Sequence, residues 1–344
     1  MGRHTLRLRE ATRARGFASE IYVDTVDEES ADEAMPVLAY PQTARPGDVV
    51  VYQFATASAM APWLAGRSET LVVNYHNVTP PELMAPWDNH LALGQLRAQG
   101  DLRLLAPRTA LAVADSRYNE GHLAAAGFVR TAVVSPSAAL QTADTDTAAD
   151  GPVPAGGGAR WLSVGRVSPN KGLESTIAAL AVARAHGDPE ATLLLIGKPA
   201  TDSYVAALHR YVADLGLAGA VRFAGHASDA TVAAAYADAD VLVVTSEHEG
   251  FCVPVVEALG AGLPVVAFDQ GAIPEVLGGA GVLVQDKDPY ALAAAIATLS
   301  RDAPRRDALV AAGRERLAAL DLHSAAERFV DLLVPLTTSA PATP

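Results

Sequence analysis

The amino-acid sequence has one cysteine, three lysines and no long apolar run among its 344 residues. The single cysteine, Cys252, excludes a disulfide framework and a metal site made of several cysteines. No apolar stretch reaches the roughly 18 residues that a membrane-spanning helix needs, and we recognise no secretory signal peptide before the first predicted helix. From these absences we expect a cytoplasmic protein.

Negative charge predominates, with a formal net charge of −13 at pH 7. An acidic chain of this kind is not expected to bind nucleic acids in general. With 50% hydrophobic and 19% charged residues the composition is that of a globular protein, and the length suits about two domains. Only Lys171, Lys198 and Lys287 interrupt the preference for arginine, and a lysine is expected where a compact, flexible point charge is needed.

Two segments alternate between strand and helix patterns, which predicts doubly wound α/β domains. The first begins with a helix at 4–16 and continues with strands at 19–26, 48–54, 69–76 and 109–116. The second has strands at 160–167, 191–198, 221–226, 240–246, 263–268 and 281–284. We predict a first domain over 1–137, a flexible linker over 138–158, a second domain over 159–320, a C-terminal helix over 321–336 and a tail over 337–344.

Two glutamates bracket seven residues without another charge just after the predicted strand 240–246, in the stretch EGFCVPVVE. Ligands of doubly wound sheets lie outside the carboxyl ends of the strands, and Pro254 suits the first residue of a helix. The amides of 250–253 would then form an anion site at the helix N-terminus, with Glu249 and Glu257 as acceptors for hydroxyls. A sugar nucleotide needs both kinds of group, because its diphosphate oxygens accept hydrogen bonds and its sugar hydroxyls donate them. Alternatively, Glu249 is solvated and Glu257 only interacts with the helix dipole.

Two cations follow the first strand of the same predicted domain, in VGRVSPNKGLE. Arg166 lies at the strand tip, Ser168 suits a helix cap, Pro169 suits the opening of that helix, and Lys171 falls in its first turn. Both cations are expected to face the crevice of the glutamates, where they could clamp a diphosphate. Alternatively, they form an ordinary surface pair.

These stretches, with LLLIGKPATDSYVAAL, VRFAGHASDATVAAAYADADVLVVTSEHEGFCVPVVEALGAGLPVVAFDQGAIPEVL and GVLV, run in order from about 160 to 285. They resemble the nucleotide-binding domain of family 4 glycosyltransferases (glycosyl transferases group 1), which have the two-domain GT-B fold with an interdomain cleft. The resemblance implies that Arg166 and Lys171 bind the diphosphate and that Glu257 holds the ribose. It also implies that Glu249 and the backbone of the loop hold the donor hexose, the loop residues being Gly250, Phe251, Cys252 and Val253. We interpret Cys252 as a packing residue.

The first half resembles the family more loosely, through LVVNYHNVTPPE. Many members place a histidine beside the donor sugar here, so His76 is implied as a catalytic residue together with Glu249. A structural alternative is that TPPE forms a capping box that opens the next helix. Ser116 is predicted to be a plain helix cap.

The family's first strand and its glycine-rich loop have no counterpart, since the chain begins inside the first helix, with only Gly2 and His4 as remnants of the loop. We expect roughly 15–25 further residues upstream that encode the strand and its turn.

Neither a metal nor a cofactor is predicted. Asp-x-Asp occurs at 144–146, 238–240 and 286–288, but these fall in the linker, before a strand and outside the donor crevice. The cations can neutralise the leaving group without a metal, and the G-x-G-x-x-G dinucleotide fingerprint is absent. The arginine-rich first helix could touch the inner face of an anionic membrane, although such a run is more often a solvated face. Its arginines are at 3, 7, 9, 13 and 15.

The sequence therefore predicts an enzyme that moves a hexose from a UDP- or GDP-linked sugar to an unknown acceptor, which could be a glycan, a lipid or a small molecule. The resemblance implies a retaining, metal-independent reaction. Two alternatives stay open. One is a catalytically impaired protein that only binds sugar nucleotides, which the missing first strand suggests, and the other is a nucleotide-sugar epimerase of the GT-B fold.

Overall fold

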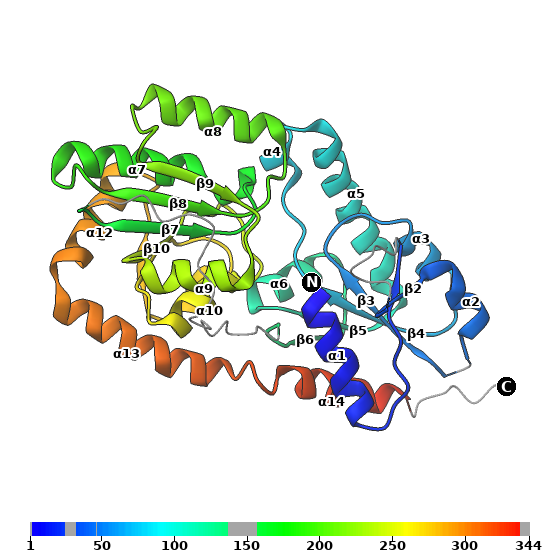
Figure 1. The fold of residues 1–344 in the computed structure, drawn as a ribbon. Coiled ribbons are helices and arrows are strands. Elements are labelled where there is room, and N and C mark those ends of the chain that lie inside the picture. The colour runs from blue at the N-terminus through cyan, green and yellow to red at the C-terminus, as the bar shows by residue number, and fades with distance from the viewer. Residues whose placement is uncertain (1, 25–31, 46, 137–156, 338–344) are drawn as a thin grey trace. The chain divides into compact units, whose positions relative to one another are not determined.

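The computed structural model describes residues 2–24, 32–45, 47–136 and 157–337, which form two compact units (Figure 1). Unit 1 comprises Met1–Val78, Arg97–Ala138 and Asp321–Pro344, and unit 2 comprises Thr79–Leu96 and Ala139–Leu320. Residues 79–96 thus group with unit 2, although the predicted first domain contained them, and the C-terminal helix belongs to unit 1. Nearly all of the predicted linker and tail lies outside the described residues.

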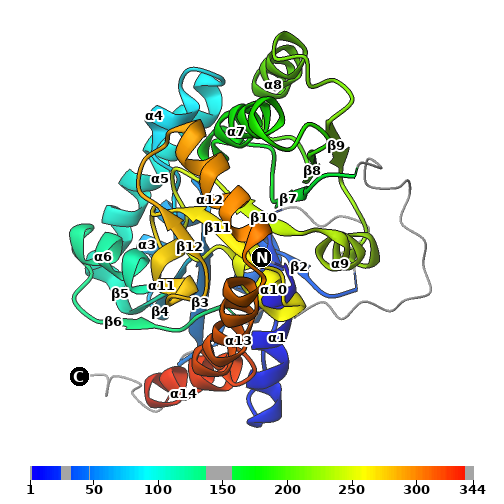
Figure 2. The ribbon, with the colours of Figure 1, turned by 90° about the vertical axis from the view of Figure 1, so that its left-hand side faces the viewer.

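Unit 1 is built on a four-stranded parallel sheet with the order β3-β4-β5-β6. The strands are β3 (Val49–Phe54), β4 (Thr70–Tyr75), β5 (Thr109–Ala114) and β6 (Thr131–Val133). Apolar side chains on one face pack against α3 (Met60–Ala65), α5 (Asn89–Leu105) and α6 (Arg117–Ala125). The other face is covered by α1 (Gly2–Ala14) and α14 (Ala325–Thr337), which lie side by side (Figure 2). Both faces are therefore buried, as in a doubly wound domain.

Short elements of unit 1 depart from the sequence-based expectations. The predicted strand 19–26 is reduced in the described residues to β1 (Tyr22–Val23), which pairs with β2 (Met35–Pro36). The three-residue strand β6 was not predicted, because three residues show no periodicity. The remaining short elements of unit 1 are η1 (Val37–Ala39), α2 (Tyr40–Thr43) and η2 (Ala106–Arg108), whereas α4 (Pro81–Met84) lies in the part of unit 2 that begins at Thr79.

Helix starts test two of the predicted caps. Ser116 precedes α6 and its Oγ accepts a hydrogen bond from the Asn119 amide at 3.1 Å, so this cap is confirmed. The predicted capping box of TPPE is wrong, because α4 begins at Pro81 and its N-cap is Pro80, which makes no side-chain bond. Proline fixes an extended entry to this short helix without any capping hydroxyl.

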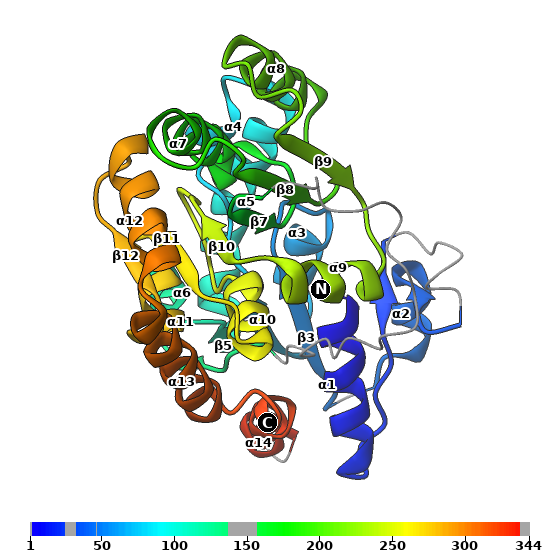
Figure 3. The same ribbon diagram turned by 60° about the vertical axis from the view of Figure 1, so that its left-hand side comes forward.

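Unit 2 contains a six-stranded parallel sheet with the order β12-β11-β10-β7-β8-β9. Helices α7 (Leu173–His186), α8 (Asp202–Asp214) and α12 (Pro289–Arg301) pack on one face. Helices α9 (Asp229–Asp238) and α10 (Val253–Ala261) lie on the other (Figure 3). The strands are β7 (Arg160–Val164), β8 (Thr192–Ile196), β9 (Val221–Gly225), β10 (Val241–Val244), β11 (Val265–Phe268) and β12 (Val282–Val284); η3 (Pro169–Lys171), α11 (Ile273–Leu277) and α13 (Ala303–Leu320) complete the unit.

The strand order of unit 2 reverses between β7 and β10. From β7 the chain continues outward to β8 and β9, whereas from β10 it continues in the opposite direction to β11 and β12. The loops that follow these two neighbouring strands therefore diverge to opposite faces and leave a crevice at their carboxyl ends, which is where doubly wound folds bind ligands.

The basic helix α1 is engaged within its own unit. Arg9 pairs with Glu33, Arg13 with Glu20 at 3.1 Å, and Arg15 with Asp331 at 2.6 Å. These pairs favour the interpretation of the arginines as an ordinary polar face. In the ranges that the structure describes, no helix combines the length and the apolar character that crossing a bilayer requires.

Candidate functional site

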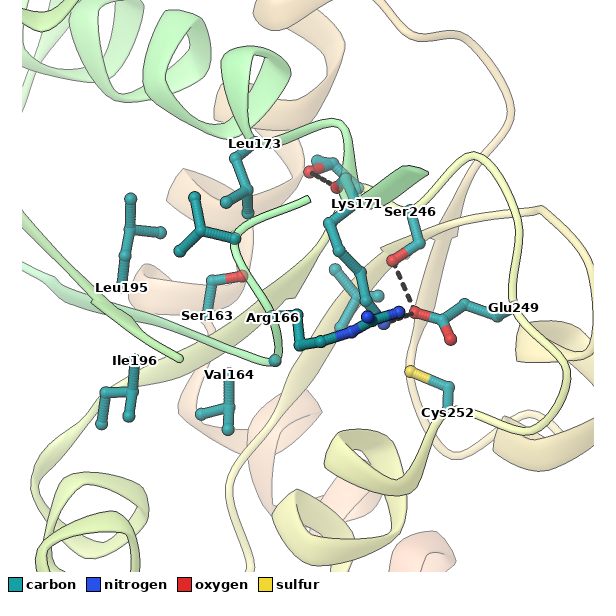
Figure 4. A pocket seen from close by; sticks show the side chains of 14 residues that line it. Ser163, Val164, Arg166, Lys171, Leu173, Leu195, Ile196, Ser246, Glu249 and Cys252 are labelled. Carbon is teal, nitrogen blue, oxygen red and sulfur yellow. Dashed lines mark hydrogen bonds and ion pairs between the residues drawn. The ribbon is translucent and has the colours of Figure 1, made fainter. Parts of the chain in front are cut away.

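A small pocket lies at the crevice between β7 and β10 (Figure 4). Both predicted cations, Arg166 and Lys171, line it together with the predicted acid Glu249. Cys252 closes the pocket on the side of α10. Side chains that the sequence reasoning had missed also contribute, namely Ser163, Thr245 and Ser246. The polar run TSE at the end of β10 was the signal that could have identified two of them.

Lys171 reaches the pocket from a turn that differs from the predicted helix start, whereas Arg166 lies just after β7. Pro169 to Lys171 form the separate 3-10 turn η3, and α7 begins only at Leu173. Ser168 does not cap a helix as predicted, because its Oγ donates to Oδ1 of Asn170 at 2.7 Å. The turn ends at Gly172, which adopts the left-handed conformation with φ 57°. This break directs Lys171 back toward β10.

Glu249 is buried, with 8% of its surface exposed, and its carboxylate is paired. Lys171 Nζ donates to Oε1 at 2.5 Å and Ser246 Oγ donates to the same oxygen at 2.7 Å. Burial alone would lower the pKa of Lys171, but the Glu249 carboxylate more than offsets this and the pKa is raised. In Figure 4 the exposed Arg166 side chain extends toward this pair. The three groups together carry one net positive charge, which suits an anionic ligand.

The loop that carries Glu249 is held on two sides. Toward η3, Thr245 Oγ1 donates to the carbonyl of Gly172 at 2.9 Å, and the Glu247 amide donates to the carbonyl of Asn170 at 2.8 Å. Toward α11, the Ala272 amide donates to the carbonyl of Glu249 at 3.0 Å. The position of the carboxylate is thus fixed by backbone bonds before any ligand arrives, which is the kind of preorganisation that binding sites need.

Helix α10 begins at the pocket. Its N-cap is Cys252, in the left-handed conformation with φ 70°, and Pro254 is the second helical residue instead of the predicted first. Proline is tolerated at either position because neither amide has an intrahelical acceptor. Gly250, Phe251 and Val253 complete the loop, as predicted for the hexose-binding backbone, although they do not line the small pocket itself.

Cys252 is inert by its surroundings, which favours the predicted packing role. The side chain is 5% exposed, and burial followed by the nearby Glu249 raises the pKa of its thiol. The reactive thiolate is therefore scarce at neutral pH. We expect iodoacetamide at pH 7.5 to modify the folded chain at least about 100-fold more slowly than the urea-unfolded chain. Mass spectrometry of this sole cysteine measures both rates, and equal rates would contradict the assignment.

Glu257 lies one turn into α10 and is half-buried. It does not line the small pocket. The hydroxyl of Tyr236, on α9, donates to its Oε2 at 2.8 Å. Tyr236 is 3% exposed, and its pKa is raised by burial and then by Glu257. No pattern in the sequence indicates this partner, because α9 and α10 are brought together only by the fold.

His76 lies in unit 1, directly after β4. Its Nδ1 is 2.9 Å from Oδ2 of Asp115, and its Nε2 is 2.6 Å from Oε1 of Gln53. Asp115 is the residue just before the Ser116 cap, at the end of β5. Sequence reasoning identified the histidine but neither of its partners.

The Asp-x-Asp motifs have structural partners where they are described. Asp238 and Asp240 both bind Arg160, at 3.3 and 3.1 Å, and Asp288 caps α12 by accepting from the Tyr290 amide at 3.1 Å. The motif at 144–146 falls outside the described residues. Within the described part of the chain, no group of three or more His, Cys, Asp or Glu could hold a metal ion.

Comparison with known proteins identifies relatives of unit 2 and of the whole fold. Residues 150–316 match the family model described as "Glycosyl transferases group 1". The MMP alpha-(1->4)-mannosyltransferase of Mycolicibacterium hassiacum is 34% identical over 139 residues, which cover 40% of this chain and 33% of the relative. The D-inositol 3-phosphate glycosyltransferase of Corynebacterium urealyticum is 28% identical over 303 residues, which cover 80% of this chain and 70% of the relative.

A solved structure extends the similarity to both units. HepE of Anabaena, in complex with UDP-glucose, matches with a TM-score of 0.72 at 21% identity, and the match covers 96% of each chain. At this identity the likeness establishes the fold alone, and it confirms the predicted GT-B architecture of α/β domains. The chain spans about a third of the length of several curated relatives that it matches, such as the mannosyltransferase at 33%.

Proposed function

We propose that this chain is a group 1 glycosyltransferase, because its residues 150–316 match that family model, and that it transfers a hexose from a UDP- or GDP-linked sugar to an acceptor. The observation that carries this proposal is the group of Arg166, Lys171 and Glu249 at the point where the strand order reverses. HepE, which shares the fold, was solved with UDP-glucose, and this supports a nucleotide sugar as the donor.

Different charged groups of the site can bind different parts of the donor. Arg166 and Lys171 neutralise the diphosphate as it departs, and such stabilisation of developing charge is a major part of catalysis. Lys171 and Ser246 both bind Oε1 of Glu249, so Oε2 can accept a hydrogen bond from a hydroxyl of the hexose. In this proposal Glu257 accepts a hydrogen bond from the ribose, and His76 is a catalytic residue.

The finer features of the reaction rest on the same residues. The two cations supply the positive charge that a metal would otherwise provide, so we propose a metal-independent reaction without a cofactor. Retention of configuration follows from the resemblance of the Glu249 loop to retaining enzymes. In this proposal the acceptor is a glycan, a lipid or a small molecule. We place the enzyme in the cytoplasm, in keeping with its cysteine content.

A screen of UDP- and GDP-linked hexoses by thermal shift tests the proposal. A donor present at about 100 times its dissociation constant stabilises the fold by about 2.7 kcal/mol, which raises the melting temperature measurably. Hydrolysis of the stabilising donor, measured with and without EDTA, then tests turnover and metal dependence. If no nucleotide sugar shifts the melting temperature, the proposal is wrong. Binding without hydrolysis or transfer would favour a sugar-nucleotide-binding protein.

Tyr236→Phe tests the assignment of Glu257 to the ribose. Removing the hydroxyl takes away one hydrogen bond that orients the Glu257 carboxylate, and one such bond is worth about 1–1.5 kcal/mol. We therefore expect the affinity for the nucleoside diphosphate to fall by about five- to tenfold, whereas that for the 2′,3′-dideoxy analogue stays unchanged. Isothermal titration calorimetry measures both ligands. Tyr290→Phe, at an exposed tyrosine, is the matched control, and equal losses with both ligands would point to a disturbed fold.

A further inference from the structure

The turn that carries Lys171 joins two helical segments of unit 2. The turn η3 ends at Lys171, Gly172 adopts the left-handed conformation, and α7 begins at Leu173. The first amides of a helix have no acceptor within that helix, and a left-handed residue interrupts the row of carbonyl acceptors before it. Buried backbone groups without a partner are costly. The turn therefore depends on hydrogen-bond partners from other segments.

Thr245, directly after β10, supplies one of these partners. Its Oγ1 lies 3.1 Å from the carbonyl oxygen of Lys171, 2.9 Å from that of Gly172 and 2.8 Å from Oγ1 of Thr176 in α7. A carbonyl oxygen can only accept, so the Thr245 hydroxyl donates its single proton to the two carbonyls, and Thr176 donates to Thr245. The reverse direction would place both carbonyl oxygens against lone pairs of the Thr245 oxygen, without a proton between them.

Tyr204, in α8, supplies the partner of the next amide. The Leu173 amide donates to the Tyr204 hydroxyl at 3.1 Å, and this hydroxyl donates to Oε2 of Glu174 at 2.6 Å. Both directions follow, because an amide N–H can only donate and a carboxylate can only accept. Burial, followed by the charge of Glu174, raises the pKa of Tyr204, so the phenol keeps the proton that it donates. Its ring packs edge to face on that of Trp87, with 5.0 Å between the centroids.

The hydroxyls of Thr176, Thr245 and Tyr204, which we call the turn hydroxyls, are enclosed by protein. The exposed fraction is 0% for Thr176, 1% for Thr245 and 1% for Tyr204. Because these side chains are out of contact with bulk solvent, water cannot readily replace a hydroxyl that is removed, and its backbone partner stays unpaired. The conformation of the turn is thus coupled to three side chains from three different elements.

The turn hydroxyls affect the charged pocket through Lys171. In Figure 4 the Lys171 side chain extends to the Glu249 carboxylate, with which it forms an ion pair. A lysine side chain is long and flexible, so it loses much conformational entropy when it is held in one place. Thr245 also precedes the loop that carries Glu249. One residue therefore connects the backbone of the cation to the strand end from which its anionic partner projects.

We propose that the turn hydroxyls are positioning residues for Lys171, which fix its turn against the end of β10 and so keep its ammonium beside Glu249 before a ligand binds. Thr245 lines the pocket, but its proton is directed to the turn, so it acts through Lys171. The consequence for a diphosphate rests on the proposed function. A lysine that is already held loses less freedom on binding, so the turn hydroxyls should raise the affinity for that ligand.

Proton–carbon NMR of the full chain, labelled at Cε of lysine, tests the positioning without a ligand or any activity. The chain has three lysines, and the spectrum of Lys171→Met assigns the Lys171 signals. At pH 7.5 we expect two separate Hε signals for Lys171, because a held side chain keeps its two Hε protons in different surroundings. Thr245→Val should merge them, whereas Thr245→Ser, which retains the hydroxyl, should keep them separate. Separate signals in Thr245→Val, or a single signal in the wild type, overturn the proposal.

Tyr204→Phe is the second variant, and it decides the question if Thr245→Val does not fold. It removes the hydroxyl that accepts from the Leu173 amide and keeps the ring, so the two Hε signals of Lys171 should merge as well. Tyr211→Phe, at a half-buried tyrosine of the same helix, is the matched control and should keep them separate. Identical lysine spectra of the two phenylalanine variants overturn the proposal.

A double-mutant cycle tests whether Thr245 acts on the ligand through Lys171. With UDP and GDP as probes, isothermal titration calorimetry should show that Thr245→Val weakens binding by about three- to tenfold and that Thr245→Ser does not. In a Lys171→Met background, Thr245→Val should change the affinity by less than about twofold, since the two residues act as a unit. Equal losses in both backgrounds overturn the proposal. If the wild type binds neither nucleotide, the proposed function is wrong, and the lysine spectra alone decide the positioning role.

Discussion

Lys171→Met is expected to destabilise the fold by about 3 kcal/mol and to lower kcat/KM for the nucleotide sugar by at least about 100-fold. The first effect arises because Glu249, 8% exposed, loses the partner of its carboxylate, and a buried charge left unpaired costs about 3–5 kcal/mol. The second arises because the diphosphate loses a charge-assisted contact that strengthens as the bond to the sugar breaks. Urea unfolding followed by circular dichroism measures the stability, and donor turnover measures the rate.

Two further variants separate the two effects of Lys171→Met. Adding Glu249→Gln removes the unpaired charge while Ser246 can still donate to the side chain, so the double variant should regain most of the stability and none of the activity. Arg166→Met removes an exposed cation of the same pocket, so it should weaken diphosphate binding and change stability by less than about 0.5 kcal/mol. If Lys171→Met binds free diphosphate as tightly as wild type, the diphosphate site has been misplaced.

The contribution of the Lys171–Glu249 pair should persist through neutral pH. Burial acts against the charged ammonium, but Glu249 raises the pKa of Lys171 above its ordinary value. A raised pKa in the folded state means that the stability is fully present below the unfolded value and is lost as the pH rises through the folded value. The stability difference between wild type and Lys171→Met should therefore be constant near pH 7 and shrink only under strongly alkaline conditions.

Gly172→Ala is expected to have the second large effect, a loss of more than about 3 kcal/mol in the free energy of unfolding. The left-handed conformation alone costs a non-glycine residue about 1–2 kcal/mol. At Gly172, which has φ 57°, an added Cβ would also lie 2.4 Å from the carbonyl oxygen of Thr245. Backbone atoms on both sides must then separate. Because Lys171 precedes this glycine and Thr245 precedes the Glu249 loop, donor affinity should fall together with stability.

Gly216→Ala is the matched control for Gly172→Ala. Gly216 has φ 68°, also in the left-handed region, but no atom lies within 4 Å of its added Cβ. It should lose only the conformational cost of about 1–2 kcal/mol and keep full donor affinity. The difference between the two alanine variants then measures the close approach of η3 to β10. Similar losses of stability in both variants would show that the close contact between η3 and β10 does not contribute to the free energy of unfolding.

The strands of unit 2 could be predicted from the sequence because each is a short run of branched apolar residues, which few other structures accommodate. The strand ends, and hence Arg166 and Glu249, followed from the rule that ligands bind at the carboxyl edge. The ion pair between Lys171 and Glu249 did not follow, because it depends on the left-handed conformation of Gly172. A glycine can adopt the left-handed conformation, but its presence in the sequence does not show that it does so. The sequence therefore suggested a continuous helix from Pro169.

Unit 1 shows a different limit of sequence reasoning. His76 was identified through a family resemblance, whereas Gln53, Asn74 and Asp115 were passed over, although each is the first polar residue of an alternating apolar pattern. The pattern shows which side chains share a face of one strand. It does not show the register between strands, and register alone places these residues beside His76. The packing of α14 against the sheet of unit 1 could not be predicted either, because the pattern within one segment does not show which distant segment it contacts.

The assignment of α14 to unit 1 affects how this protein can be taken apart. The polypeptide passes between the units after residues 78, 96, 138 and 320, so both contain pieces from distant parts of the gene. A single cut in the segment 138–158 would give a first fragment without α14, one of the two helices that cover one face of its sheet. The second fragment would lack Trp87, whose ring contacts Tyr204 at 5.0 Å between centroids and whose carbonyl accepts from Ser203 at 2.7 Å. Neither half carries all of its own core, so the two fragments would have to be produced together and reassemble before either could be studied as a folded unit.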